Sequence, residues 1–386
     1  MRKVFICAVM IALSCTEKSG FDDVEQKQGD EPSPVVEVPD LSLSGIAKIL
    51  SELPIGRENL AEVYDAVSSS SENGYDEEYT MSDLFNAPGS GVGEQVTKAG
   101  GKYSKPLRDL FVEYLSNSST KAGAADVEAY INGLISSDAQ IYWPYSEDWD
   151  GKTFPIVTFD PGYGAESNYG YEIKLGKDGV RVVDSVIVNE VVAASRPVWV
   201  INRNDDSAFT PFDMFTKAQA SKKNSSSGDM LMLETFKMNR NFDSWFAGAS
   251  EFFVKIGAVD GFKAATDDDL KLYSPAVTDF MIVVKRKDVG KAVPFNTILL
   301  SDVTDQMEKV SFLIIEDDGG TTTSWKTSAV VKYESKSYGF ELEIPYKDKD
   351  DVVWRGQLAM SMFRRDTAVT GRFGDVEIGF RRERYQ

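Results

Sequence analysis

Apolar positions between residues 42 and 138 recur every three to four residues, which is the period of an amphipathic helix. The pattern predicts helices over residues 46–53, 60–67, 107–115 and 127–135, and a short helix over 81–85. Pro54 ends the first of these runs, and Pro106 stands at a first-turn position, where the missing N–H of proline is tolerated. We therefore expect a helical domain over residues 42–138.

After residue 138 the pattern changes to short β-branched and aromatic runs divided by Gly, Pro, Asp and Asn. Strands are predicted over 140–145, 154–159, 171–175, 180–192 and 197–202, and in a second series over 231–238, 280–285, 297–300, 310–315, 325–333, 340–344, 352–362 and 376–380. Lys177-Asp178-Gly179 is a hairpin-turn signal. Residues 203–228 are predicted to be an exposed loop, and residues 245–259 a helical insertion.

The order of these elements predicts an α+β fold. The helical domain is followed by mostly antiparallel β domains, because polar residues alternate with apolar ones in the later strands. We place a β-rich domain at residues 139–228 and a β-sandwich domain at residues 229–386. The order of the layers is not predicted.

The first residues have the pattern of an export signal. Arg2 and Lys3 form a positive region, Val4 to Leu13 an apolar one, and Leu13-Ser14 precedes Cys15. This segment resembles the signal peptides of bacterial lipoproteins, and its relaxed lipobox with an acidic tether is similar to those of Bacteroidetes. The resemblance implies cleavage after residue 14, lipidation of Cys15 and attachment to a membrane. An ordinary secretory signal is the alternative.

The lipoprotein interpretation sets the expected location and domain order. Residues 1–14 are the signal peptide, and residues 15–41, which are acidic and carry three prolines, form a flexible tether. We expect an exported protein that is anchored to the bacterial cell envelope, at the outer membrane. The net charge of −19 repels a phosphate backbone, so nucleic acid is not an expected partner.

The chain contains no histidine, which excludes a Ser-His-Asp triad and an H-E-x-x-H zinc site. Its two cysteines, Cys7 and Cys15, both lie in the signal region, so thiol catalysis and thiolate zinc sites are excluded from the body of the chain. Carboxylate, lysine, tyrosine or hydroxyl chemistry and an oxygen-ligated metal remain. These absences favour a protein without catalytic activity.

Two acidic segments are candidates for a calcium site, which is the one cofactor we expect if there is any. They follow a predicted strand at residues 316–320 and separate two later strands at residues 348–351. Ca²⁺ takes six to eight oxygen ligands in irregular geometry, so loops that meet at one end of a sandwich can bind it. The run Asp348–Val353 resembles the second calcium loop of C2-type sandwiches. The candidate ligands are Asp317, Asp318, Asp348, Asp350 and Asp351, and the alternative is that these are solvated turns.

A third acidic segment has part of the spacing of an EF-hand. Asn239, Asn241 and Asp243 are spaced as its first three ligands, but Ser244 replaces the required glycine and Glu251 falls one position late. We interpret these residues as turn and capping residues unless the fold brings them together.

An aromatic segment is a candidate ligand-binding surface. Trp143, Tyr145 and Trp149 alternate with acidic residues, a composition suited to stacking on a sugar while carboxylates bind its hydroxyl groups. Neighbouring strand residues face opposite sides, so core packing is the alternative for these rings.

Two hypotheses of function follow. The first is a non-catalytic, lipid-anchored binding or interaction module for a glycan or protein ligand, stabilised by calcium. The second is a carboxylate-based hydrolase such as a glycosidase, which requires two acids 5–10 Å apart in a cleft and neither histidine nor cysteine.

Overall fold

The computed structural model describes residues 40–86, 103–118, 124–175, 181–204 and 228–385, which belong to one unit from Val38 to Gln386. Cys15, the predicted signal peptide and nearly all of the predicted tether lie outside the described residues. The Lys177-Asp178-Gly179 turn and most of the predicted loop at 203–228 also lie outside them. The described chain is α+β with mostly antiparallel strands, and its C-terminal part is sandwich-like, as the sequence predicts.

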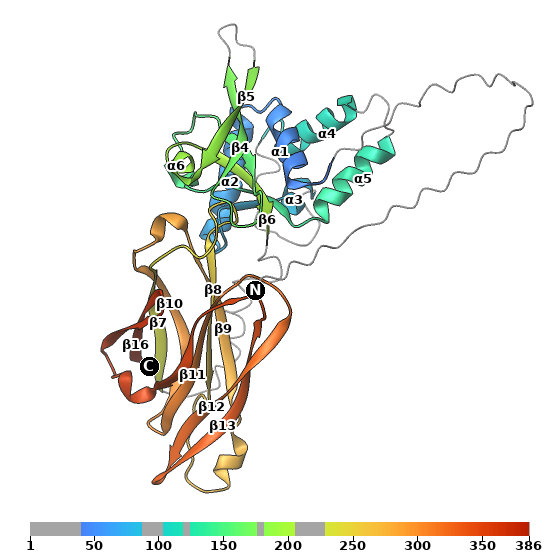
Figure 1. The fold of residues 1–386 in the computed structure, drawn as a ribbon. Coiled ribbons are helices and arrows are strands. Elements are labelled where there is room, and N and C mark those ends of the chain that lie inside the picture. Colours follow the sequence, from blue (N-terminus) through green and yellow to red (C-terminus); the bar gives the residue numbers. More distant parts are fainter. Residues whose placement is uncertain (1–39, 87–102, 119–123, 176–180, 205–227, 386) are drawn as a thin grey trace, which may run out of the picture. The chain divides into compact units, whose positions relative to one another are not determined.

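Residues 40–204, which we call the α/β portion, form a mixed sheet covered by helices (Figure 1). The strands are ordered β1-β2-β6-β3-β4-β5, and all pairs are antiparallel except β3 with β6. The elements are α1 (Leu43–Glu52), α2 (Arg57–Glu72), β1 (Glu78–Thr80), α3 (Met81–Phe85), α4 (Leu107–Ser118), α5 (Ala124–Ile135), β2 (Ala139–Tyr142), β3 (Ile156–Phe159), β4 (Ser167–Leu175), β5 (Arg181–Asn189), α6 (Glu190–Ala193) and β6 (Val198–Arg203).

The central strands of this sheet are covered on both faces. On β6, Trp199 and Ile201 pack into the core shared with the helices, whereas Val198 and Val200 pack into a second core on the opposite face. The first core combines residues of α1 to α5 with residues of β2, β3 and β6. The domain boundary predicted at residue 138 therefore falls inside one hydrophobic core.

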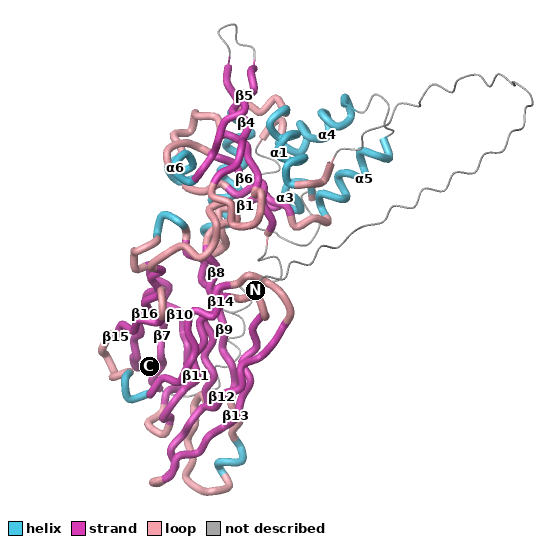
Figure 2. Tube along the Cα trace, viewed as in Figure 1, coloured by secondary structure: helices cyan, strands magenta, loops and turns pink. Residues whose placement is uncertain are grey.

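Residues 228–385, which we call the β-sandwich, consist of two packed sheets. One has the order β10-β7-β16-β15 and the other β13-β12-β11-β8-β9, with β14 also paired to β11. The strands are β7 (Gly228–Met238), β8 (Ser250–Ala258), β9 (Ala276–Val284), β10 (Val293–Val303), β11 (Met307–Glu316), β12 (Thr322–Tyr333), β13 (Lys336–Lys347), β14 (Asp351–Ala359), β15 (Ala368–Phe373) and β16 (Val376–Tyr385). Strands dominate this part of the chain, as Figure 2 shows.

The β12–β13 hairpin covers the outer face of the second sheet. Leu313 and Ile315 of β11 point away from the main sandwich core and pack against Ile344 of β13, with Phe253 of β8 beside them. The next outward position of β8 after Lys255 is Gly257, where a Cβ atom would come within 2.2 Å of the Leu342 side chain. Strands β8 and β11 are therefore buried on both faces.

One predicted element is wrong. Residues 245–259 do not form a helix, because Ser250–Ala258 is strand β8, paired with β9 on one side and β11 on the other. Burial on both faces explains the error, since a continuous apolar run lacks the period of two that identifies a half-exposed strand. The sequence also gave no prediction for β1 or β15.

Helix α4 begins beside a buried carboxyl group. Glu62 of α2 is 3% exposed, and its Oε2 accepts a hydrogen bond of 2.6 Å from the backbone N–H of Leu107. Burial raises the pKa of Glu62 to about 7, against the opposing effect of this hydrogen bond. The folded protein therefore binds a proton at Glu62 more tightly than the unfolded chain does.

We predict that Glu62→Gln reduces the loss of stability on going from pH 5 to pH 8. Because the folded pKa lies above the unfolded value, the contribution of Glu62 is complete below about pH 4.5 and is lost as pH rises through 7, by up to about 3 kcal/mol. Gln keeps an acceptor for Leu107 and carries no charge. Urea unfolding of both proteins at the two pH values measures the difference.

Glu128→Gln, at an exposed position of α5, is the control. Equal pH dependence in the wild type and Glu62→Gln would contradict the assignment.

Candidate metal centre

The structure brings the two predicted acidic loops together. The backbone N–H of Asp318, after β11, lies 3.4 Å from Oδ1 of Asp350, which is in the β13–β14 turn. Oδ2 of Asp350 accepts a hydrogen bond of 2.7 Å from the N–H of Lys347. Asp350 is 8% exposed, and burial followed by the neighbouring Asp317 carboxyl raises its pKa to about 6. Asp350 therefore connects the β13–β14 turn to the loop after β11.

Two other predicted ligands are also used within these loops. Both carboxylate oxygens of Asp317 lie 2.9 Å from Nζ of Lys347, which neutralises that charge. Oδ1 of Asp348 accepts a hydrogen bond of 2.7 Å from the N–H of Thr321. Asp317, Asp348 and Asp350 thus stabilise the loop conformations, while the charges of Asp318 and Asp351 act on a third acidic group.

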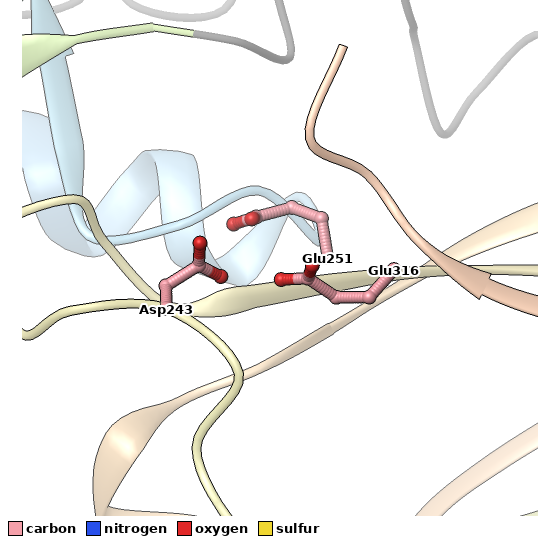
Figure 3. A group of neighbouring side chains, drawn as sticks. All are labelled: Asp243, Glu251 and Glu316. Atoms are coloured by element: carbon pink, nitrogen blue, oxygen red, sulfur yellow. The ribbon is translucent and has the colours of Figure 1, made fainter. Parts of the chain in front are cut away.

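That group consists of Asp243, Glu251 and Glu316, which we call the carboxylate cluster (Figure 3). One carboxylate oxygen of each residue lies within 4.8 Å of the corresponding oxygens of the other two. Figure 3 shows the Glu251 and Glu316 side chains extending toward the Asp243 carboxylate. Asp243 comes from the segment before β8, Glu251 from β8 and Glu316 from the end of β11. The pairing of β8 with β11, in which Glu316 is opposite Phe252, brings two of the three candidate ligands close together.

The cluster is buried and lacks compensating donors at two of its oxygens. Glu316 is 1% exposed and Glu251 is 5% exposed. Among the described residues, no hydrogen-bond donor reaches Oε1 of Glu316 or Oδ2 of Asp243. An isolated buried carboxylate without a donor costs several kcal/mol, so the group requires a proton or a cation.

Electrostatics in the cluster favour uptake of positive charge. Burial, and then the contact with Asp243, raise the pKa of Glu316 far above its usual range. Burial likewise raises the pKa of Asp243. The contact between these two residues is a hydrogen bond only when one of them keeps its proton, and then they titrate as a pair.

Asp318 and Asp351 extend the negative field around the cluster. Asp351 pairs across the β11–β14 ladder with Glu316, and its charge contributes to the raised pKa of Glu316. Partial burial, then the charges of Asp243 and Asp351, raise the pKa of Asp318 to about 6. The charges of Asp318 and Asp351 therefore add to the negative charge of the carboxylate cluster.

These residues fit a hard divalent cation. All the candidate donors are carboxylate oxygens, and Ca²⁺ takes six to eight oxygens, with carboxylates binding through one or both of theirs. Three carboxylates in bidentate mode supply up to six oxygens. The absence of histidine and cysteine ligands makes a zinc or copper site a poor match.

The predicted aromatic residues lie at the edge of the α/β core. Trp143 is 1% exposed, and its ring packs against those of Tyr64, Trp149 and Trp199 at centroid distances of 5.3–6.0 Å. Trp149 is half-buried, and its Nε1 donates to the carbonyl of Thr153. The hydroxyl of Tyr145 donates to Glu190. The three rings do not form one exposed platform, because Trp143 is inside the core.

The cluster combines residues from two acidic segments that are far apart in the sequence. Glu316 begins the first predicted acidic loop, whereas Asp243 and Glu251 belong to the segment with incomplete EF-hand spacing. A single EF-hand loop is the wrong template, because the ligands come from separate strands. Their convergence depends on the pairing of β8 with β11. This pairing could not be predicted, because residues 245–259 were predicted to be helical.

None of the helices among the described residues has both the length and the apolar character needed to cross a membrane. No protein-family model, no curated protein and no solved structure significantly matches this chain.

Proposed function

We propose that this protein is a non-catalytic, lipid-anchored interaction module of the bacterial cell envelope, whose β-sandwich binds Ca²⁺ at Asp243, Glu251 and Glu316. The observation that carries the proposal is the Glu316 carboxyl group, which is 1% exposed and has an oxygen without a donor in the midst of other acids. Asp318 and Asp351 add negative charge near these three ligands, or bind the ion through water. The C2-like character of the Asp348–Val353 run is part of this proposal.

Burial argues for a cation site and against a carboxylate hydrolase at this position. A glycosidase needs two acids on either side of a bond of a large substrate, with room for the sugar between them. Here the oxygens lie within 4.8 Å of one another, and Glu251 and Glu316 are almost fully covered. A single ion fits this arrangement, whereas a sugar ring does not.

The remaining parts of the proposal rest on the sequence. The lipobox with Cys15 supports attachment to the outer membrane, and the acidic tether at residues 15–41 supports display of a folded body away from it. The net charge of −19 supports a glycan or protein ligand over a nucleic acid. Calcium stabilises such a module outside the cytoplasm by binding its folded state alone.

We predict that excess Ca²⁺ raises the melting temperature of the full chain relative to EDTA. An ion at 100 times its Kd stabilises the folded state by about 2.7 kcal/mol, which corresponds to a rise of a few degrees. In Glu316→Gln the rise should disappear, because an amide is a weaker calcium ligand than a carboxylate. The variant should remain folded in EDTA, since Gln retains the volume and its amide donates to Asp243 in place of the shared proton. Differential scanning calorimetry measures both effects.

Asp348→Asn is the matched control. The carboxylate of Asp348 accepts the N–H of Thr321, which belongs to the neighbouring loop before β12, and the Oδ1 of Asn retains that acceptor. This variant should therefore respond to Ca²⁺ as the wild type does. A wild type that does not respond to Ca²⁺, or a full response in Glu316→Gln, would refute the cation site.

A second prediction concerns the anchor. In a bacterial host that processes lipoproteins, the full chain should incorporate labelled palmitate and fractionate with membranes, whereas Cys15→Ser should do neither. Cys7→Ser is the control, since Cys7 lies in the segment that is removed. Label retained in Cys15→Ser would sink the lipoprotein interpretation.

A further inference from the structure

The candidate ligand Asp243 lies in a segment that also contacts the α/β portion. Residues 239–249, which we call the linking segment, connect β7 to β8 in the β-sandwich. The backbone carbonyl of Asp243 accepts a hydrogen bond of 3.2 Å from Nη1 of Arg286. The same guanidinium group donates from Nε to Glu190 of the α/β portion, at 2.6 Å. The side chain of Asp243 thus belongs to the carboxylate cluster, while its backbone is linked through Arg286 to the α/β portion.

Apolar contacts of the linking segment follow directly after Asp243. Trp245 and Phe246 are both 0% exposed, and they pack into the second core of the α/β portion beside Tyr142, Ile156 and Val200. Nε1 of Trp245 donates to the carbonyl of Glu166 at 3.1 Å. The segment therefore fills a face of the α/β sheet that would otherwise expose a large apolar area.

Polar contacts fix the end of the linking segment. Nδ2 of Asn202, on β6, donates to the carbonyl of Ala247, and Nη1 of Arg286 donates to the carbonyl of Gly248 at 3.3 Å. The N–H of Ala249 donates to Oδ2 of the buried Asp76 at 2.9 Å. Gly248, at φ 147°, passes so close to Asp76 that a Cβ atom would lie 3.0 Å from the same oxygen. This docking requires one backbone conformation of the linking segment.

We infer that cation binding at the carboxylate cluster and docking of the linking segment on the α/β portion are coupled, so that each strengthens the other. The inference rests on the proposed function, because it assigns a role to that same site. With the ion bound, Asp243 is held beside Glu251 and Glu316. Without the ion, Asp243 lacks the ligand bonds that would hold it beside Glu251 and Glu316, and it is only two residues from Trp245 and six from Ala249.

The first test is hydrogen–deuterium exchange on the full chain with Ca²⁺ and with EDTA. Coupling predicts slower exchange with Ca²⁺ in peptides that cover the linking segment, and also in peptides around Asp76 and Asn202, which contain none of the proposed ligands. Protection confined to residues near Asp243, Glu251 and Glu316 would overturn the inference while leaving the cation site intact.

The second test uses the reciprocity of coupled equilibria. Asn202→Ala removes a donor to Ala247 and alters no carboxylate, so coupling predicts that its Kd for Ca²⁺ rises by about fivefold or more in calorimetric titration. Asn59→Ala is the matched control, because Asn59 makes the same kind of side-chain amide bond, to the carbonyl of Lys105, within the helices. The control should bind Ca²⁺ as the wild type does.

The outcomes separate the two claims. A wild type that binds Ca²⁺ and an Asn202→Ala variant of unchanged Kd would reject coupling alone. A wild type that does not bind Ca²⁺ would reject the proposed function and the coupling with it. Should Asn202→Ala fail to fold, the exchange experiment on the wild type still decides the question.

Discussion

Burial of the Glu251 and Glu316 carboxyl groups against Asp243, next to the segment that packs on the α/β portion, is the physical constraint on which the proposed site depends. The chain shows elsewhere how it compensates a buried acid. Asp229 is 4% exposed, yet Arg365 and Arg382 both donate to its Oδ2, and the carboxylate is kept ionised with a lowered pKa despite the opposing effect of burial. Among the described residues, no arginine donates in this way to Oε1 of Glu316 or to Oδ2 of Asp243, although Glu316 is only 1% exposed. We propose that a cation from solvent supplies the compensating charge of this cluster.

The position of this cluster matters as much as its charge. Asp350 accepts a backbone hydrogen bond from Lys347 in its own turn, and Asp348 accepts one from Thr321 of the neighbouring loop, so an ion bound there would stiffen only these surface loops. Asp243, in contrast, belongs to the linking segment, whose Trp245 and Phe246 rings lie 3.9 Å apart between centroids in the core of the α/β portion. An ion bound at Asp243, as proposed, would reduce the conformational freedom of a segment that packs into that core.

The sequence was sufficient for those parts of the fold in which one face of an element meets solvent. The short helix Met81–Phe85 and the antiparallel hairpin of β12 and β13 follow from local periodicity. It was insufficient for β8, because the sandwich core covers one face and the β12–β13 hairpin the other, which erases the alternation of polar and apolar residues. The same limit applies to the candidate site. The acidic loops at 316–320 and 348–351 were recognised from their composition, but their convergence and the approach of Asp243 to Glu316 were not predictable, because both depend on which strands pair with β11.

A site built from separate strands differs physically from one built in a single loop. An EF-hand loop carries its ligands within twelve residues, so cation binding there orders mainly local backbone. The carboxylate cluster joins residues 243, 251 and 316, and the first and last of these are brought together only after the sheet has formed. The unfolded chain would therefore offer no comparable site, and under the proposed function nearly all the binding free energy of an ion would add to the stability of the folded state. The proton shared by Asp243 and Glu316 would compete with a bound ion for the same oxygens, so the stabilisation by the proposed ion should increase as pH rises. Without an ion the dependence is opposite, because acids with raised pKa values lose their stabilising effect as pH rises.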